Sequence, residues 1–516
     1  MPKLRQIVRG ISLNWVALAT SLVVGFFLSP FVVHQLGNIA YGIWTLVVSL
    51  ISYMGLLDLG LRGAVTRFVS REHTQGKHAE ASRAVSAAFW IRLWIGLAAV
   101  ALSLVLSGVA PAIFRIPAEM IAAARWAIVV TAISFAMTLV CGVFGGVLAA
   151  LHRFDQLSGV SVLQTVVRAA GVVLVLKSGY GIVALALWEL AAVVMANLAL
   201  TALCFRAYPD LRISLRRPDT DILRSLWAYS IYVFLINMCI QVIYYTDNLV
   251  VGAFISAEAV TFFAIGGTLI EYLRQLVASL TMTFTPLASN FEAEGQHDRL
   301  RQLLIHGTRA AMFVALPIEL ALFFRGPTFI GLWMGEQYAS ASGQVLQVLL
   351  LAQAFAIANY TSGGIAYGME KHRPVALWAM GEAVANLVLS ILLVRQMGLI
   401  GVAWGTVIPS LITSLLLWPR YVTRILEMSL GQYLWQSWGR PTLAAVPFGV
   451  ACWLTDRFWH PTSLLHFFLQ IAAVLPLYLL GMALCFWKDV TAQLRTRTRK
   501  SRAESRSVMT DEQARS

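Results

Sequence analysis

The chain has 516 residues, of which 59% are hydrophobic and only 12% are charged, and it carries a net charge of +14. Soluble domains carry roughly 25% charged residues, so this composition excludes an ordinary soluble protein and indicates a chain with many membrane spans. No polar stretch is long enough for a separate soluble domain. We expect a basic, uncleaved N-terminus, because no small-residue cleavage site follows the first apolar run.

The apolar runs predict an all-α polytopic membrane protein. They do not alternate in polarity, and lipid tolerates only helices or closed barrels. Each run is close to the roughly 20 residues that cross a bilayer. We therefore expect about fourteen helices, over residues 10–34, 39–60, 84–109, 121–150, 157–176, 181–205, 226–254, 257–288, 302–325, 343–368, 374–394, 398–419, 441–459 and 464–487.

The stretch over residues 34–77 shows a pattern that the rest of the chain repeats. A short uncharged turn at Gly37 and Asn38 precedes an apolar run from Ile39 to Leu57. A basic exit follows, with Arg62, Arg67, Arg71 and Lys77. This order predicts a helix that crosses the membrane from an uncharged side to a basic side.

The same stretch carries a family resemblance. The pattern LG-xxx-YGIW at residues 36–44, followed by DLGL at residues 58–61 and a basic helix, resembles the bacterial polysaccharide transporters known as Wzx-type O-antigen flippases. These belong to a superfamily that includes multidrug and toxin extruders and lipid II flippases. The resemblance covers about residues 5–487 and implies a transporter of lipid-linked oligosaccharide in the bacterial inner membrane.

The distribution of Lys and Arg predicts the orientation. One set of connections, which includes both termini, holds 29 of these residues, whereas the opposite set holds 5. Basic residues concentrate on the cytoplasmic side of membrane proteins. We therefore expect both termini in the cytoplasm and an even number of helices.

An internal repeat predicts two pseudo-symmetric six-helix halves. GGVLAALHRF at residues 145–154 resembles GGIAYGMEKH at 363–372, and GIVALA at 181–186 resembles GVAWGT at 401–406. Substrate sites in such transporters lie between the repeats. The predicted units are the first half 1–210, a cytoplasmic linker 211–225, the second half 226–425, a helix pair 426–487 and a basic, disordered tail 488–516.

Charged residues inside spans are the main candidates for function, because each costs at least roughly 2.5–3.5 kcal/mol at the bilayer centre. Guanidinium groups suit diphosphate because they bond two oxygens and stay charged. Three structural alternatives to anion binding remain. Arg168 would pair with Glu189, Arg274 would pair with Glu271, and Arg92 would extend to the lipid headgroups. The candidate anion-binding residues are Arg92, Arg168, Arg274 and Arg309.

Acidic and amide side chains supply two further sets of candidates. Asp247 and Asn248, with Asn14 and Asn237, are candidates for contacts with sugar hydroxyls, although single polar residues often only join helices. Glu189, Glu271 and Glu382 are candidates for proton or sodium coupling, with salt bridging to arginine as the alternative.

We expect a flippase and not an enzyme, since no catalytic motif and no metal motif is present. No cofactor is expected beyond the proton or sodium ion. The resemblance implies lipid-linked oligosaccharide and membrane lipids as partners, with a polysaccharide polymerase and glycosyltransferases as candidate partners and no nucleic acid. The alternatives are a multidrug or cation antiporter or a lipid II flippase of the same superfamily and, from another class, a membrane polysaccharide polymerase or ligase.

Overall fold

The computed structural model describes residues 4–58, 61–214 and 238–486, and within these ranges the chain is helical and contains no strand. The elements before residue 215 are α1 (Leu4–Met54), η1 (Gly55–Asp58), α2 (Leu61–Thr74), α3 (His78–Ile113), η2 (Ala118–Met120), α4 (Ile121–Ala150), α5 (Phe154–Lys177) and α6 (Ile182–Ala207).

After the linker, a helix over residues 238–254 leads into a second series of elements. These are α8 (Ala257–Thr281), α9 (Phe284–Ala293), α10 (His297–Met334), α11 (Glu336–Ala358), α12 (Tyr360–Gly368), α13 (Arg373–Ile412), η3 (Thr413–Leu417), α14 (Trp418–Ile425), α15 (Leu430–Leu434), η4 (Trp435–Gly439) and α16 (Arg440–Phe458). A last helix covers Leu464–Phe486.

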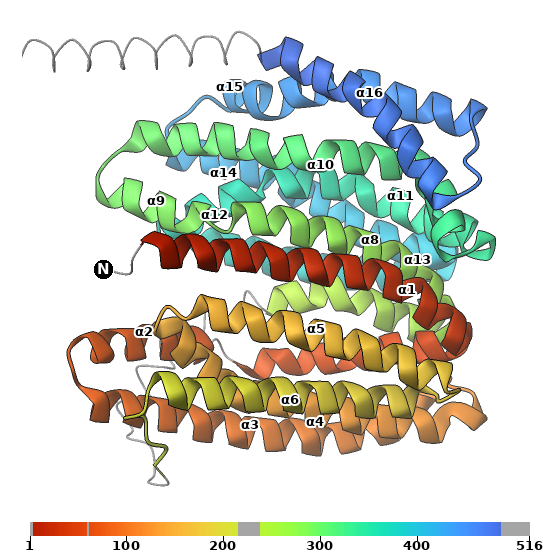
Figure 1. Cartoon of the computed structure of the whole chain (residues 1–516). Coiled ribbons are helices and arrows are strands. Elements are labelled where there is room, and N and C mark those ends of the chain that lie inside the picture. Colours follow the sequence, from red (N-terminus) through yellow and green to blue (C-terminus); the bar gives the residue numbers. More distant parts are fainter. Residues whose placement is uncertain (1–3, 59–60, 215–237, 487–516) are drawn as a thin grey trace, which may run out of the picture.

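Two of the long helices are broken by a glycine. Gly37 in α1 has φ 76° and ψ 167°, and Gly398 in α13 has φ 60° and ψ −133°. Glycine tolerates positive φ because it has no Cβ. A straight helix of the length of α1 would measure about 77 Å, more than twice the hydrocarbon core of a bilayer. Figure 1 shows α1 turning back on itself, which confirms the turn predicted at Gly37.

Helices suited to a membrane fill most of the described chain. Over residues 4–58, 61–214 and 238–486, nine stretches are long and apolar enough to cross a bilayer. They are Leu13–Met54, His78–Ile113, Ala118–Ala150, Phe154–Lys177, Ile182–Ala207, His297–Met334, Glu336–Gly368, Arg373–Ile425 and Leu464–Phe486. The first and the eighth of these contain the glycine breaks.

Turns with positive φ recur at a constant separation along the chain. The two members of each pair lie 218 or 219 residues apart. The helix starts after the first pair also match, since Lys77 has φ −88° and ψ 62° and Gln296 has φ −88° and ψ 63°. The pairs are Gly76 and Gly295, His152 and Glu370, and Gly179 and Gly398. The second pair falls inside the repeat seen in the sequence.

Helix α1 lies at the boundary between two groups of helices. In Figure 1, α2 to α6 gather below α1, whereas α8, α10, α11 and α16 lie above it. The contacts agree, since α1 packs against α5 on one side and against α8 on the other. We call the end of the bundle with α2, α9 and the turns at 151–153 and 369–372 the basic end, and the end with the Gly37 turn the neutral end.

Asn38 ties the two groups together at the neutral end. Its side-chain amide donates to Glu258 Oε1 (3.3 Å), its Oδ1 accepts from the Tyr338 hydroxyl (2.6 Å), and its carbonyl accepts from the Thr261 hydroxyl (2.6 Å). Just beyond it, a Cβ on Gly42 would lie 1.7 Å from the Ala257 carbonyl oxygen. The glycine therefore allows the backbones of α1 and α8 to touch.

A buried arginine joins the last two helices to α10. Arg325 has no exposed surface and donates to Gln470 Oε1 at 2.5 Å. Its Nε lies 3.7 Å from Asp456 Oδ1 of α16, and that oxygen also accepts from the Thr328 hydroxyl at 2.7 Å. These contacts fix α16 and the helix Leu464–Phe486 against α10.

Candidate functional site

Arg274 of α8 belongs to a charged pair with an aromatic neighbour. The Arg274 guanidinium pairs with Glu271 Oε2 at 2.6 Å, one helical turn away. It also lies over the ring of Tyr244, 3.4 Å from the centroid. The Arg274 side chain is 18% exposed and that of Glu271 is 41% exposed. The i,i+3 pair, which the sequence offered as the structural alternative to anion binding, is therefore present, and its more exposed member is the carboxylate.

A second charged pair lies on the other side of α1. Arg168 of α5 donates through Nε to Glu189 Oε1 of α6 at 2.6 Å, and half of the Arg168 side chain is exposed. The two helices approach closely here, because a Cβ on Gly171 would overlap the ring of Trp188. The bridge that the sequence offered as the structural alternative to anion binding by Arg168 is therefore present.

The other two candidate arginines bond to the backbone of neighbouring elements. Arg92 is 1% exposed and donates to the Leu139 carbonyl of α4 at 2.9 Å. The alternative that it extends to the headgroups is wrong, because its side chain is buried and bonded to α4. Arg309 donates to the Gln436 carbonyl at 2.8 Å, and its guanidinium lies 5.0 Å from the Phe486 ring. It packs against the C-terminal helices.

Asp247, a candidate for contacts with sugar hydroxyls, is buried against α13. It is 5% exposed, and its Oδ2 accepts from the Thr406 hydroxyl at 2.6 Å. That hydroxyl lies 2.8 Å from Asn386 Nδ2. Among the described residues, no cation pairs with the carboxylate. Asp247 Oδ1 and Asn386 Oδ1 are both buried and accept no hydrogen bond. The geometry gathers oxygen atoms around a buried acid that has no counter-charge.

The polar residues around Asp247 come from both arms of α13. Ser390 Oγ lies 3.4 Å from the Val402 carbonyl oxygen across the break at Gly398. Sequence reasoning missed Asn386, Ser390 and Thr406 as site residues. The signal for Asn386 and Ser390 was the four-residue interval that links them to Glu382 and places all three on one helix face. Glu382 continues this line and accepts from the Thr413 hydroxyl at 2.8 Å.

The amide candidates lie in three different settings. Asn248 donates to the Ser49 hydroxyl of α1 at 3.1 Å. Asn14 is exposed on α1. Asn237 lies outside the described residues, as do most of the predicted linker 211–225 and the predicted tail 488–516.

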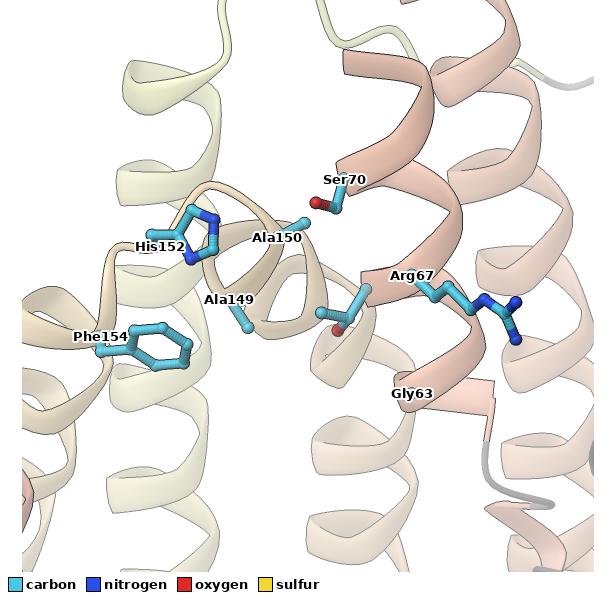
Figure 2. Close-up of a pocket in the computed structure, with 8 residues that line it drawn as sticks. Gly63, Arg67, Ser70, Ala149, Ala150, His152 and Phe154 are labelled. Carbon is cyan, nitrogen blue, oxygen red and sulfur yellow. The ribbon is translucent and has the colours of Figure 1, made fainter. Parts of the chain in front are cut away.

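An open pocket of about 560 Å³ lies at the basic end, apart from these charged groups. Figure 2 shows Gly63, Arg67 and Ser70 of α2 facing the end of α4 and the start of α5. The Arg67 side chain points away from His152 and Phe154. No cluster of metal ligands occurs among the described residues.

Known proteins are similar to this chain in sequence and in fold. A family model described as "Polysaccharide biosynthesis protein" matches residues 36–343. The membrane protein EpsK of Bacillus subtilis is 23% identical over 80% of this chain and 82% of its own length. A putative O-antigen transporter of Shigella flexneri is 21% identical over 75% of this chain and 91% of its own.

The fold is that of a solved transporter. The structure of the lipid II flippase MurJ in an inward closed conformation matches with a TM-score of 0.69 at 15% identity, over 92% of this chain and 99% of that chain. The long apolar helices and these relatives together identify the chain as a multi-pass membrane transporter of polysaccharide biosynthesis. Since the family model covers more than half of the sequence, the chain belongs to the polysaccharide biosynthesis protein family of flippases and O-antigen transporters.

Proposed function

We propose that this protein flips a polyprenyl-diphosphate-linked oligosaccharide, the precursor of an O-antigen or exopolysaccharide, from the cytoplasmic to the outer leaflet of a bacterial inner membrane. The family and the names of the relatives support this substrate class. We place both termini and the basic end in the cytoplasm, because 29 Lys and Arg lie in those connections and 5 in the opposite ones.

We further propose fourteen crossings in two six-helix halves, within 1–210 and 226–425, and a final pair within 426–487. The breaks at Gly37 and Gly398 support this number, because each divides one long helix into two arms. The repeated turns support the two halves. In this arrangement Asn38 closes the outer side between the halves, so release of the substrate requires its contacts to open.

The observation that carries the anion-binding role is the partly exposed Arg274. A guanidinium at inner-half depth suits the diphosphate of a lipid entering from the cytoplasmic leaflet. One charge-assisted hydrogen bond contributes about 1.5–3 kcal/mol, so Arg274→Gln should weaken binding of undecaprenyl diphosphate to the purified protein roughly tenfold to a hundredfold. Arg274→Lys should restore only part, because it keeps the charge but loses the fork.

The rival explanation is that Arg274 only neutralises Glu271, and a double variant separates the two. If the arginine binds ligand, Arg274→Gln with Glu271→Gln reaches the membrane in normal amounts but fails to bind undecaprenyl diphosphate and to export glycan. Normal binding and export by the double variant would refute the ligand role. Arg395→Gln is the matched control, since Arg395 lies over Phe254, away from this group.

We also propose that a sodium ion drives the transport and binds at Asp247. The donor set fits a hard cation, because it consists of carboxylate, amide, hydroxyl and carbonyl oxygens. Bound sodium would supply the counter-charge that a buried carboxylate needs. The residues that would hold it are Asp247, Asn386, Ser390 and Thr406.

Sodium binding can be measured directly on the purified protein. The wild type should bind radioactive sodium in a scintillation proximity assay, and Asp247→Asn should lose most of that binding. Glu382→Gln tests the sodium candidate named from the sequence on the same helix, and we expect its binding to equal that of the wild type, since Glu382 bonds to Thr413 of η3. Equal sodium binding by the wild type and Asp247→Asn would refute this site and leave the role of Arg274 untouched.

A further inference from the structure

The two residues that flank Asp247 both bond to α1. The Tyr53 and Thr246 hydroxyls are hydrogen-bonded to each other, and Asn248 Nδ2 donates to Ser49 Oγ at 3.1 Å. Neighbouring residues on a helix point about 100° apart. One turn of the 238–254 helix therefore holds the Asp247 carboxylate toward α13 and holds its two flanking side chains against α1.

These bonds lie where water cannot easily replace them. Ser49 is 1% exposed, Thr246 is 6% exposed and Asp247 is 5% exposed. A buried polar group that loses its partner is costly, so the bonds resist breaking one at a time. Ser49 and Tyr53 are four residues apart and share one face of α1. Ser49 and Tyr53 therefore hold the 238–254 helix at the two residues that flank Asp247.

Toward the neutral end, apolar packing holds the same two helices together. A Cβ on Gly252 would lie 2.6 Å from Leu46 Cδ2, so α1 and the 238–254 helix are in close contact one turn further on. The second arm of α1 then reaches the Asn38 contacts with Glu258 and Tyr338. One rigid helical arm thus connects the surroundings of Asp247 with the closed neutral end.

We infer that Ser49 and Tyr53 are positioning residues that transmit the occupancy of the Asp247 site to the neutral end through the second arm of α1. This inference rests on the sodium site proposed above. A cation at Asp247 changes the strength of the hydrogen bond from the Thr406 hydroxyl to the carboxylate. Any resulting shift of the 238–254 helix must move Thr246 and Asn248 with it. Their bonds carry that shift to α1.

The test separates binding from transmission. Hydrogen–deuterium exchange of the wild-type protein in nanodiscs, in sodium chloride and in choline chloride, reports on the peptides that cover residues 36–44 and 255–262. We expect sodium to change their exchange. The variants Tyr53→Phe and Ser49→Ala each remove one hydroxyl and little volume. We expect either to reduce the sodium-dependent change at least twofold, and the double variant to abolish it.

The same variants should still bind sodium, within about threefold of the wild-type affinity, because neither hydroxyl belongs to the oxygen set around Asp247. Ser52→Ala is the matched control: its hydroxyl bonds only the Val48 carbonyl of its own helix at 2.8 Å, so its sodium response should equal that of the wild type.

Each contrary outcome has a definite meaning. A full sodium response in the double variant, or an equal loss in Ser52→Ala, overturns the transmission role. Loss of sodium binding in a folded double variant also overturns it, because the hydroxyls would then belong to the ion site. A wild type that binds no sodium overturns this inference together with the proposed sodium site, whereas the anion-binding role is decided by the Arg274 variants alone.

Discussion

Replacement of Gly42 by alanine should force the neutral end of the molecule open. The new Cβ would lie 1.7 Å from the Ala257 carbonyl oxygen and 2.7 Å from its carbon. An ordinary contact between carbon and oxygen is about 3.3 Å. The two backbones must therefore separate by about 1.6 Å, because neither atom belongs to a flexible side chain.

The cost follows from the hydrogen bonds around this contact. Three bonds of Asn38, to Glu258, Thr261 and Tyr338, now measure 3.3, 2.6 and 2.6 Å. A separation of about 1.6 Å would break them, at about 0.5–1.5 kcal/mol each. The closed state should lose about 2–4 kcal/mol, which shifts the equilibrium toward the open state at least roughly tenfold.

The assay is thiol labelling of intact cells with a membrane-impermeant maleimide, in a background without native cysteines. Val260→Cys is the reporter, since Val260 is fully buried in α8 and belongs to the same apolar cluster as Ile43. We expect Gly42→Ala to raise its labelling rate at least about tenfold. Gly267→Ala is the control, because a Cβ there meets no atom within 4 Å. An unchanged labelling rate together with normal export would refute the reasoning.

Three further predictions can be tested separately. A single cysteine in place of Ser256 should be labelled by the same reagent from outside and one in place of Ser214 should be protected; the reverse result would overturn the orientation. Arg168→Gln with Glu189→Gln should change the apparent Tm by less than about 2 °C, because a pair whose arginine is half exposed contributes about 0.2–1 kcal/mol. The double variant should still reduce export if Arg168 binds the anion, and unchanged export would remove Arg168 from the site. Arg325→Leu should destabilise the purified protein by about 3 kcal/mol in denaturation measurements, since it breaks a buried charged network, and a stable variant would show that the last helix pair is held by apolar packing alone.

The sequence determined the parts of this protein that depend on local pattern. Apolar runs of bilayer length predicted the helices, and an uncharged Gly-Asn pair between two such runs predicted the turn at Gly37, where φ is positive. The pair of Arg274 with Glu271 followed from their spacing on one helix. The pair of Arg168 with Glu189 followed from the depth of each residue, counted along two consecutive helices joined by a short turn.

Only the tertiary structure decided which polar residues meet across helices distant in the sequence. Asp247 lies 159 residues from Thr406, and nothing local to either residue indicates the other. The same holds for Arg92, which bonds to the backbone of Leu139 in α4, and for Arg309, which reaches the backbone of Gln436 127 residues away. Helical periodicity tells which face of a helix is polar, but the partner of that face depends on how all the helices pack. In a membrane this matters more than in water, because a buried polar group has only other protein groups to satisfy it.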